Sequence, residues 1–208
     1  MPLYKTITPN SQTVVKIWKI TEPFDALMQS VSLKPKSLDR VLGMKSELHQ
    51  RGFLSVRMLL AEFGYDDVDL HYDENGKPYL LDGKHISITH SFNFSAIIIS
   101  DAIIGIDIEK QRDKISVIAH KFVEYESYYL DESAIDYINK LTIIWCVKES
   151  LYKLFATPGL SFKQHCLVIP MSDNELETVA WIDYEDKKHK YNVQFLEFEG
   201  FTCAYALS

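Results

Sequence analysis

Apolar and polar residues alternate along several short stretches of the chain, which is the pattern of half-buried β-strands. Alternation predicts a strand over residues 13–20 and two strands in ISITHSFNFSAIIIS, joined by a tight connection near residues 91–93. The segment GIDIE, at residues 105–109, predicts another strand. Four later segments are predicted strands as well: CLVIP, ETVAWIDY, YNVQFLEF and FTCAYAL.

Other segments have apolar residues at helical spacing instead. Residues 37–64 predict a long helix that stops at Gly64, because glycine readily adopts the left-handed conformation that ends helices. The segment LTIIWCVKESLYKLFATPG, at residues 141–159, predicts a strong helix that ends before Pro158–Gly159. Residues 117–130 predict a third helix. Both halves therefore begin with strands, continue with a long helix stopped by glycine and return to strands. This order suggests an internal duplication.

The composition is that of an ordinary folded protein, of one domain or two small fused domains. Of the 208 residues, 47% are hydrophobic, which is enough for a real core. The formal net charge is -7, so the field of the whole protein repels nucleic acid and anionic membranes. We expect neither as a partner, and any anionic partner must meet a local basic patch.

The spacing of the cysteines and the absence of long apolar runs predict where in the cell the protein is located. Cys146, Cys166 and Cys203 show no CxxC or zinc-type spacing, which favours reduced thiols and argues against structural zinc. The first residues lack the apolar region of a signal peptide, and Asp101 interrupts the run AIIISDAIIGIDI well short of a membrane span. We therefore expect a soluble, cytoplasmic protein.

Two carboxylates lie close together in the predicted strand GIDIE. Alternation places Ile106 and Ile108 on one face, and Gly105, Asp107 and Glu109 on the other. Paired oxygen ligands at this spacing suit a hard cation such as Mg²⁺. The alternative is a half-buried strand whose polar face is simply hydrated.

The predicted helix after residue 141 carries a second pair of charged residues, in the segment WCVKESLYK. Glu149 and Lys153 are one helical turn apart and share a face, whereas Lys148 lies mostly on another face with Leu151. The alternative to a functional role is an ordinary surface ion pair of little energetic value.

His90 and Lys77 are further candidates for chemistry. His90 ends an apolar strand beside Thr89 and Ser91, but a serine hydrolase is excluded because GxSxG is absent and strand neighbours point to opposite faces. His90 then either makes a local hydrogen bond or contacts a phosphate. Lys77 follows the turn signal Asn75–Gly76, where a cation either holds phosphate or is simply solvated.

These features follow one another along the chain as GKP, THS, GIDIE and WCVKESLYK. This order resembles the 4'-phosphopantetheinyl transferase superfamily, particularly its larger surfactin-activating (Sfp-like) type. The signature of that family is a Gly-hydrophobic-Asp-x-Glu strand followed by a helix with W-x-x-K-E-x-x-x-K, matched here by residues 105–109 and 145–153. The compound pattern is specific, whereas its parts are common.

The resemblance implies an enzyme that moves the phosphopantetheine arm of coenzyme A onto a serine of an acyl or peptidyl carrier protein. Adenosine 3',5'-bisphosphate would be released, and the cation would be Mg²⁺ or Mn²⁺. By the same resemblance, Asp107, Glu109 and Glu149 would hold the cation. Glu149 would also be the general base toward the carrier serine, directly or through water, and Lys153 would stabilise charge developing on the pyrophosphate.

Five other residues are assigned to the coenzyme by the resemblance. His90 would contact a phosphate beside Thr89, which stands where the family usually has serine. Lys77 would lie by the adenine or the 3'-phosphate, Arg51 by the 3'-phosphate, and Lys148 elsewhere along the coenzyme. In FVEYESYYL, more than one glutamate matches an acid that the family often has, so this segment stays unassigned.

The fold implied by the resemblance is an α+β pseudo-dimer of two similar halves, and hence a monomer. The halves would be residues 1–102, with coenzyme contacts, and residues 103–208, with the metal and catalytic residues. Carrier docking needs a local apolar and basic surface. Residues 110–121, which include Arg112 and Lys114, are a candidate, and a solvated charge cluster is the alternative.

Two other functions are consistent with the same residues. One is a non-catalytic module that binds coenzyme A or a carrier protein without transfer. The other is a Mg²⁺-dependent phosphodiester hydrolase in which water replaces the carrier serine. Coenzyme turnover without a carrier would favour the hydrolase.

Overall fold

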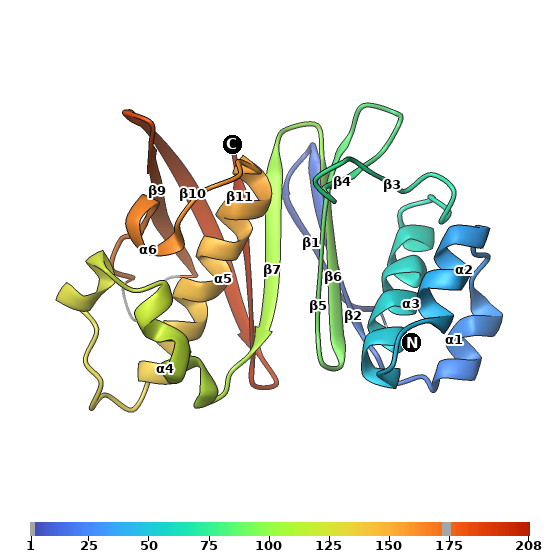
Figure 1. The fold of residues 1–208 in the computed structure, drawn as a ribbon, viewed down its shortest axis with the longest axis horizontal. Helices are drawn as coiled ribbons and strands as arrows, with labels where there is room; N and C mark the ends of the chain where they lie inside the picture. Colours follow the sequence, from blue (N-terminus) through green and yellow to red (C-terminus); the bar gives the residue numbers. More distant parts are fainter. Residues whose placement is uncertain (1–2, 172–175) are drawn as a thin grey trace. The chain divides into compact units, whose positions relative to one another are not determined.

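Helices packed on antiparallel sheets make up the chain, as the computed structural model in Figure 1 shows. The structure describes residues 3–171 and 176–208. The chain separates into two units, Met1–Ala102 and Ile103–Ser208. The predicted α+β class is confirmed. Within the described ranges, none of the helices combines the length and apolar character needed to cross a bilayer.

The first unit contains a four-stranded antiparallel sheet with the order β1-β2-β6-β5. Its β5 and β6 form the predicted hairpin, in which Ser91 pairs with Phe94. Two very short strands flank the Asn75–Gly76 turn. The strands are β1 (Leu3–Asn10), β2 (Thr13–Lys19), β3 (His71–Tyr72), β4 (Pro78–Tyr79), β5 (His85–Ser91) and β6 (Phe94–Ser100).

Three helices accompany this sheet: α1 (Phe24–Ser30), α2 (Pro35–Leu42) and α3 (Glu47–Glu62). The single helix predicted over residues 37–64 is wrong at its start, because the chain leaves the helical path between α2 and α3. Gly43 caps α2: its N–H donates to the Asp39 carbonyl oxygen at 3.0 Å, and the Met44 N–H donates to the Val41 carbonyl oxygen at 3.3 Å. Glycine in a helix interior costs about 1 kcal/mol relative to alanine, which favours a break at this point.

The core of the first unit lies where α3 packs on the sheet. Leu54, Leu59 and Leu60 of α3 are fully buried in one cluster with Ile97 of β6 and Trp18 of β2. Gly64, just after α3, has a φ of +84°, so glycine ends this helix as the sequence predicted.

The second unit has a five-stranded antiparallel sheet with the order β7-β11-β10-β9-β8. All the strands predicted here are present, and β10 starts earlier than its apolar pattern suggested. The strands are β7 (Ile104–Lys110), β8 (Cys166–Val168), β9 (Glu177–Tyr184), β10 (Lys187–Phe198) and β11 (Phe201–Leu207).

One long helix, α5 (Tyr137–Phe155), packs on β7 and β11. The helix predicted over residues 117–130 is wrong. The end of the short helix α4 and two separate 3-10 turns lie there instead. Phe122 and Glu126 of this segment are fully buried, and both accept hydrogen bonds from Lys148 of α5. The short elements are α4 (Lys114–Ile118), η1 (Ala119–Lys121), η2 (Tyr125–Tyr128) and α6 (Phe162–His165).

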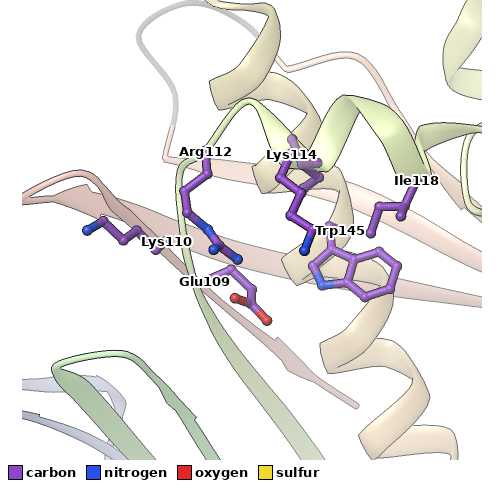
Figure 2. A pocket seen from close by; sticks show the side chains of 7 residues that line it. Glu109, Lys110, Arg112, Lys114, Ile118 and Trp145 are labelled. Carbon is purple, nitrogen blue, oxygen red and sulfur yellow. The ribbon is translucent and has the colours of Figure 1, made fainter. Parts of the chain in front are cut away.

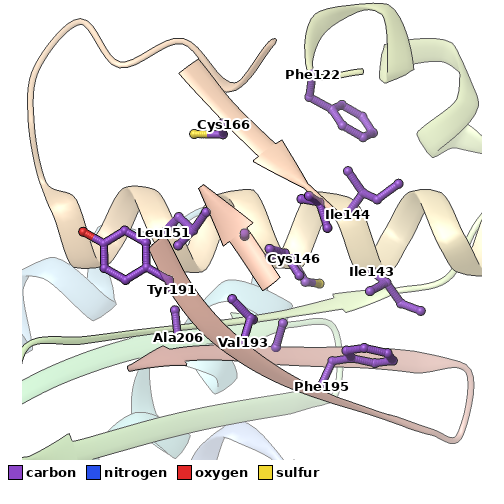
Figure 3. Packing of buried hydrophobic residues seen from close by; sticks show 14 of the residues in the cluster. Phe122, Ile143, Ile144, Cys146, Leu151, Cys166, Tyr191, Val193, Phe195 and Ala206 are labelled. Atoms are coloured by element: carbon purple, nitrogen blue, oxygen red, sulfur yellow. The ribbon is translucent and has the colours of Figure 1, made fainter. Parts of the chain in front are cut away.

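The core of the second unit lies between α5 and one face of the sheet (Figure 3). Ile144, Val147 and Leu151 of α5 are fully buried with Val193 of β10 and Ala206 of β11. Each unit therefore packs one long helix on an antiparallel sheet. That they are duplicated halves of a pseudo-dimer stays a prediction.

Candidate active site

The site of the second unit is built where α5 crosses β7. Gly105 of β7 faces the helix so closely that a Cβ there would lie 1.9 Å from the Ser150 carbonyl oxygen and 3.0 Å from the Leu154 nitrogen. Only a residue without a side chain allows this approach. Since alternate residues share a face, Asp107 and Glu109 follow Gly105 on the side that α5 covers.

Asp107 and Lys153 connect the strand and the helix. Lys153 Nζ donates to Asp107 Oδ1 at 2.8 Å and to the Ile106 carbonyl oxygen at 2.9 Å. The Asp107 side chain is 7% exposed and that of Lys153 is 27% exposed, so the ion pair is shielded from much of the solvent. The strand acid and the helix lysine of the two sequence motifs are thus brought into contact.

Glu149 lies one turn before Lys153 on α5. Burial raises the pKa of Glu149 to about 7, repulsion from Asp107 and Glu109 adds to the rise, and Lys153 opposes it. The three carboxylates therefore act on one another. A carboxyl group with such a pKa can both accept and release a proton near neutral pH.

The site has donors of the right chemistry for a metal ion, but they are not arranged around one. Over residues 3–171 and 176–208, no set of three or more His, Cys, Asp or Glu side chains is arranged to hold an ion. Lys153 instead supplies the positive charge that Asp107 contacts. The chemistry of the donors nevertheless fits a hard cation, because repulsion among Asp107, Glu109 and Glu149 is the destabilisation that a bound cation relieves.

A cavity of about 180 Å³ adjoins Glu109. Figure 2 shows the Trp145 ring, the Lys114 ammonium and the Arg112 guanidinium directed toward it. It combines an apolar floor with a basic rim. The lining residues are Glu109, Lys110, Arg112, Lys114, Ile115, Ile118 and Trp145.

Lys148 does not lie where the sequence resemblance placed it. Its side chain is fully buried, and its ammonium pairs with Glu126 at 2.9 Å, so the structure places it in the core rather than at a coenzyme surface. Burial lowers the pKa of Lys148, although Glu126 opposes this shift. Glu126 was one of the unassigned glutamates. The place of Lys148 beside Leu151 on the apolar side of the helix was the signal for its burial.

His90 and Thr89 lie in the first unit, at the end of β5. Thr89 is 6% exposed, whereas His90 is exposed. The His90 ring packs beside α3, where a Cβ at Gly52 would lie 3.0 Å from His90 Nδ1. The rings of His90 and His49 have centroids 6.5 Å apart. Gly52 therefore leaves the room that the imidazole needs.

Arg51 and Lys77 also lie in the first unit, in different settings. Arg51 donates from Nε to the Glu22 carbonyl oxygen at 2.8 Å and from Nη2 to the Ile20 carbonyl oxygen at 3.1 Å. It thereby holds the segment before α1. Burial lowers the pKa of Lys77, and Asp73 opposes the shift. A partly buried ammonium of this kind is suited to an anionic ligand.

A second cavity, of about 210 Å³, was not predicted from the sequence. It gathers several cations of the first unit, and Tyr72 and Tyr79 line it as well. Its basic residues are scattered along the chain between residues 34 and 71, so no local motif could have revealed it. The lining residues are Lys34, Lys36, Ser37, Arg40, Arg57, His71, Tyr72 and Tyr79.

Comparison with known proteins places the second unit in a family. The family model described as the 4'-phosphopantetheinyl transferase superfamily matches residues 103–206. A 4'-phosphopantetheinyl transferase of Bacillus subtilis is similar to the chain, with 29% identity over 163 residues, which is 72% of this chain and 70% of that protein. The match to the family includes both β7 and α5.

Proposed function

Because the chain belongs to the 4'-phosphopantetheinyl transferase superfamily and is therefore a transferase, we propose that it is of the surfactin-activating (Sfp-like) type. It moves the phosphopantetheine arm of coenzyme A onto a serine of an acyl or peptidyl carrier protein. The observation that carries this proposal is the contact between Asp107 and Lys153 beside a Glu149 whose pKa is raised to about 7.

The reaction is a displacement at phosphorus. The serine oxygen of the carrier bonds to the phosphorus that bears the pantetheine arm, and the bond from that phosphorus to the bridging oxygen breaks. The electron pair leaves with adenosine 3',5'-bisphosphate. The serine proton passes to Glu149, directly or through water.

Glu149 and Lys153 divide the work of this step. With no cation bound, the pKa of Glu149 is about 7, so this carboxyl group can both take up and release a proton near neutral pH. Lys153, which contacts Asp107 in the structure, would move its positive charge to the leaving phosphate when substrate binds. The two residues lie one turn apart on the same face of α5, so one helix positions the base and the charge-stabilising lysine together.

Asp107, Glu109 and Glu149 would hold Mg²⁺ or Mn²⁺. When bound, the cation would neutralise the charge of the pyrophosphate. Lys153 would then exchange its contact with Asp107 for one with the substrate. The mutual repulsion of the carboxylates, which raises the pKa of Glu149, supports this ligand set.

The first unit supplies the coenzyme contacts in this proposal. His90, Thr89, Lys77 and Arg51 are retained as candidates for its phosphates and adenine. To these we add the basic cavity beside Tyr79, which follows Lys77 by two residues. Lys36 and Arg40 of its lining suit a phosphate monoester, whereas Arg57 is paired with Asp67, and the tyrosine rings suit a base. Lys148 is not retained, because its ammonium is fully buried.

The carrier protein docks at the cavity that Trp145 lines. Its apolar floor and basic rim would take an apolar side chain from a partner of acidic surface. The net charge of the whole chain, -7, opposes such a partner, so a local basic surface is required. We further propose that a single cytoplasmic chain, as a monomer, contains every residue that the reaction needs.

Intact-mass spectrometry tests the function. An unmodified carrier protein is incubated with the enzyme, coenzyme A and Mg²⁺, with and without a chelator. We expect a gain of one phosphopantetheine arm that the chelator abolishes. Release of nucleotide from coenzyme A in the absence of carrier would instead favour the hydrolase. Coenzyme binding without any mass gain across several carriers would favour the binding module.

A further inference from the structure

A buried ion pair joins separate segments of the second unit. Lys148 Nζ donates to the Glu126 carboxylate at 2.9 Å, to the Phe122 carbonyl oxygen at 2.6 Å and to the Phe162 carbonyl oxygen at 3.1 Å. Glu126 Oε1 in turn accepts from the Val168 N–H at 2.8 Å. The three donors of the ammonium are thus matched by these acceptors.

Trp145, one turn earlier on α5, packs against the rings of Phe122 and Phe162, whose carbonyl groups bond Lys148. Its indole packs edge-on against Phe122, with centroids 5.0 Å apart, and against Phe162, at 5.5 Å. Phe122 and Phe162 therefore each make two contacts with α5: the ring packs against Trp145, and the carbonyl oxygen accepts a hydrogen bond from Lys148. The spacing of tryptophan and lysine in W-x-x-K places both on the same side of the helix.

Stability alone is a poor reason for burying such a pair. Removing two charges from water is costly, and apolar residues of similar volume often stabilise a core as well or better. An ion pair can, however, fix the positions of backbone donors and acceptors, which apolar side chains cannot do. Lys148 bonds Phe122, which directly follows the three-residue η1, and Phe162, which begins the four-residue α6, while Glu126 lies in the four-residue η2. Elements this short do not keep a position by themselves.

The segment around Phe122 leads directly to the cavity that Trp145 lines. Ile115 and Ile118 of α4 form part of its wall, and Phe122 follows α4 after the single turn η1. We infer that Lys148 and Glu126 are positioning residues that hold α4 and η1 against α5 and thereby keep the carrier-docking wall in place. This inference rests on the proposed function.

The test is a steady-state comparison of wild type with the double variant Lys148→Met/Glu126→Gln. The double variant removes both charges, so neither is left buried and uncompensated. We expect the KM for an unmodified acyl carrier protein to rise about tenfold, while kcat stays within about threefold and the KM for coenzyme A is unchanged. An unchanged carrier KM, or a lower kcat at an unchanged carrier KM, would overturn the inference.

A matched control lies on the same helix. Lys140 pairs with Asp136 at 2.8 Å, with side chains 32% and 42% exposed. The variant Lys140→Met/Asp136→Asn makes the same chemical change at an exposed site and should leave the carrier KM at its wild-type value. If the control raised the carrier KM as much as the buried pair, general loss of charge on α5 would be the cause and the inference would fail.

Hydrogen exchange on the wild-type enzyme keeps the inference testable if the double variant does not fold. Saturating unmodified acyl carrier protein should slow amide exchange in residues 114–128. Equal exchange with and without the carrier would overturn the docking role. Failure of the proposed function is distinguishable, because the wild-type enzyme would then add no arm to any carrier in the mass assay.

Discussion

Gly105 of β7 and Ser150 of α5 are so close that a Cβ on residue 105 would stand 1.9 Å from the Ser150 carbonyl oxygen. The backbones of strand and helix are therefore in direct contact at this point. Two residues further along the strand, Asp107 reaches Lys153 of the helix. The glycine of the strand motif thus determines how closely the acids of β7 approach the charged residues of α5.

We predict that Gly105→Ala lowers both stability and transfer. The helix must move away from the strand, and overpacking of this kind costs about 1–3 kcal/mol. The shift also separates Asp107 from Lys153. Urea unfolding and the carrier mass assay measure the two effects. Gly43→Ala is the control, because Gly43 has a φ of -76° and its Cβ would lie 3.3 Å from the Asp39 carbonyl oxygen, a far smaller overlap than the 1.9 Å at Gly105. A Gly105→Ala enzyme of wild-type stability and activity would contradict the packing argument.

Asp107→Asn should lower transfer by at least about 100-fold with little loss of fold, because it would weaken the proposed cation site but keeps the side-chain shape. Transfer rates are measured across a Mg²⁺ titration, and thermal unfolding checks the fold. The loss should be smallest at the highest Mg²⁺ concentration. Wild-type rates at all Mg²⁺ concentrations would remove Asp107 from the cation site.

Lys153→Ala should lower kcat by about 10²–10³-fold, as expected for losing one group that stabilises transition-state charge. The dissociation constant for coenzyme A should change much less, because the interaction strengthens only as the bond breaks. Calorimetric binding and single-turnover transfer separate these quantities. Lys140→Ala, at a partly exposed position of the same helix, serves as the control. A variant in which only binding weakens would make Lys153 a substrate-binding residue instead.

Alternation within β7 was enough to place Gly105, Asp107 and Glu109 on one face, because side-chain direction in a strand follows directly from position. The partner of that face was not predictable in the same way. Contact between Asp107 and Lys153, which are 46 positions apart, depends on where α5 crosses the sheet. That crossing is decided by packing over the whole core of the second unit.

For Lys148, the motif resemblance and the position of the residue on the helix gave different predictions. Its position on the apolar side of the helix indicated burial, yet the resemblance alone suggested a coenzyme contact. Its partner Glu126 lies in a segment whose pattern predicted a helix and which the structure resolves into short turns. Buried polar contacts override local propensity in such a segment. The basic cavity of the first unit escaped prediction for a related reason, because only the fold gathers its residues.

Lys148→Met alone should destabilise the enzyme by about 3–5 kcal/mol, because it leaves the Glu126 carboxylate buried without its charged partner. Urea unfolding followed by tryptophan fluorescence measures the loss. Lys163→Met is the matched control, since Lys163 pairs with Glu124 at 3.2 Å with side chains 41% and 63% exposed. Its effect should be below about 1 kcal/mol. Equal effects of the two substitutions would contradict the buried pairing.

Asp67→Asn should remove a contribution to the free energy of unfolding that is present at neutral pH and lost at low pH. Burial raises the pKa of Asp67, but hydrogen bonds from Ser37 and from the Lys34 backbone, with the charge of Arg57, outweigh burial and lower the pKa below 3.8. The carboxylate therefore stabilises the fold fully above its unfolded pKa, near 3.8. This stabilisation is lost as the pH falls through the lower folded pKa.

The stability difference between wild type and Asp67→Asn should accordingly be constant from pH 7 to about 5, at about 3 kcal/mol. Below the unfolded pKa of Asp67 the difference should shrink, because the wild-type carboxyl group takes up a proton on unfolding. Urea titrations at pH 7, 5 and 3 measure it. Asp101→Asn is the control, because Asp101 pairs with Lys84 at a site where its side chain is 49% exposed. A difference that persisted undiminished at pH 3 would show that Asp67 acts through shape and hydrogen bonding alone, and that its charge contributes nothing to the pairing with Arg57.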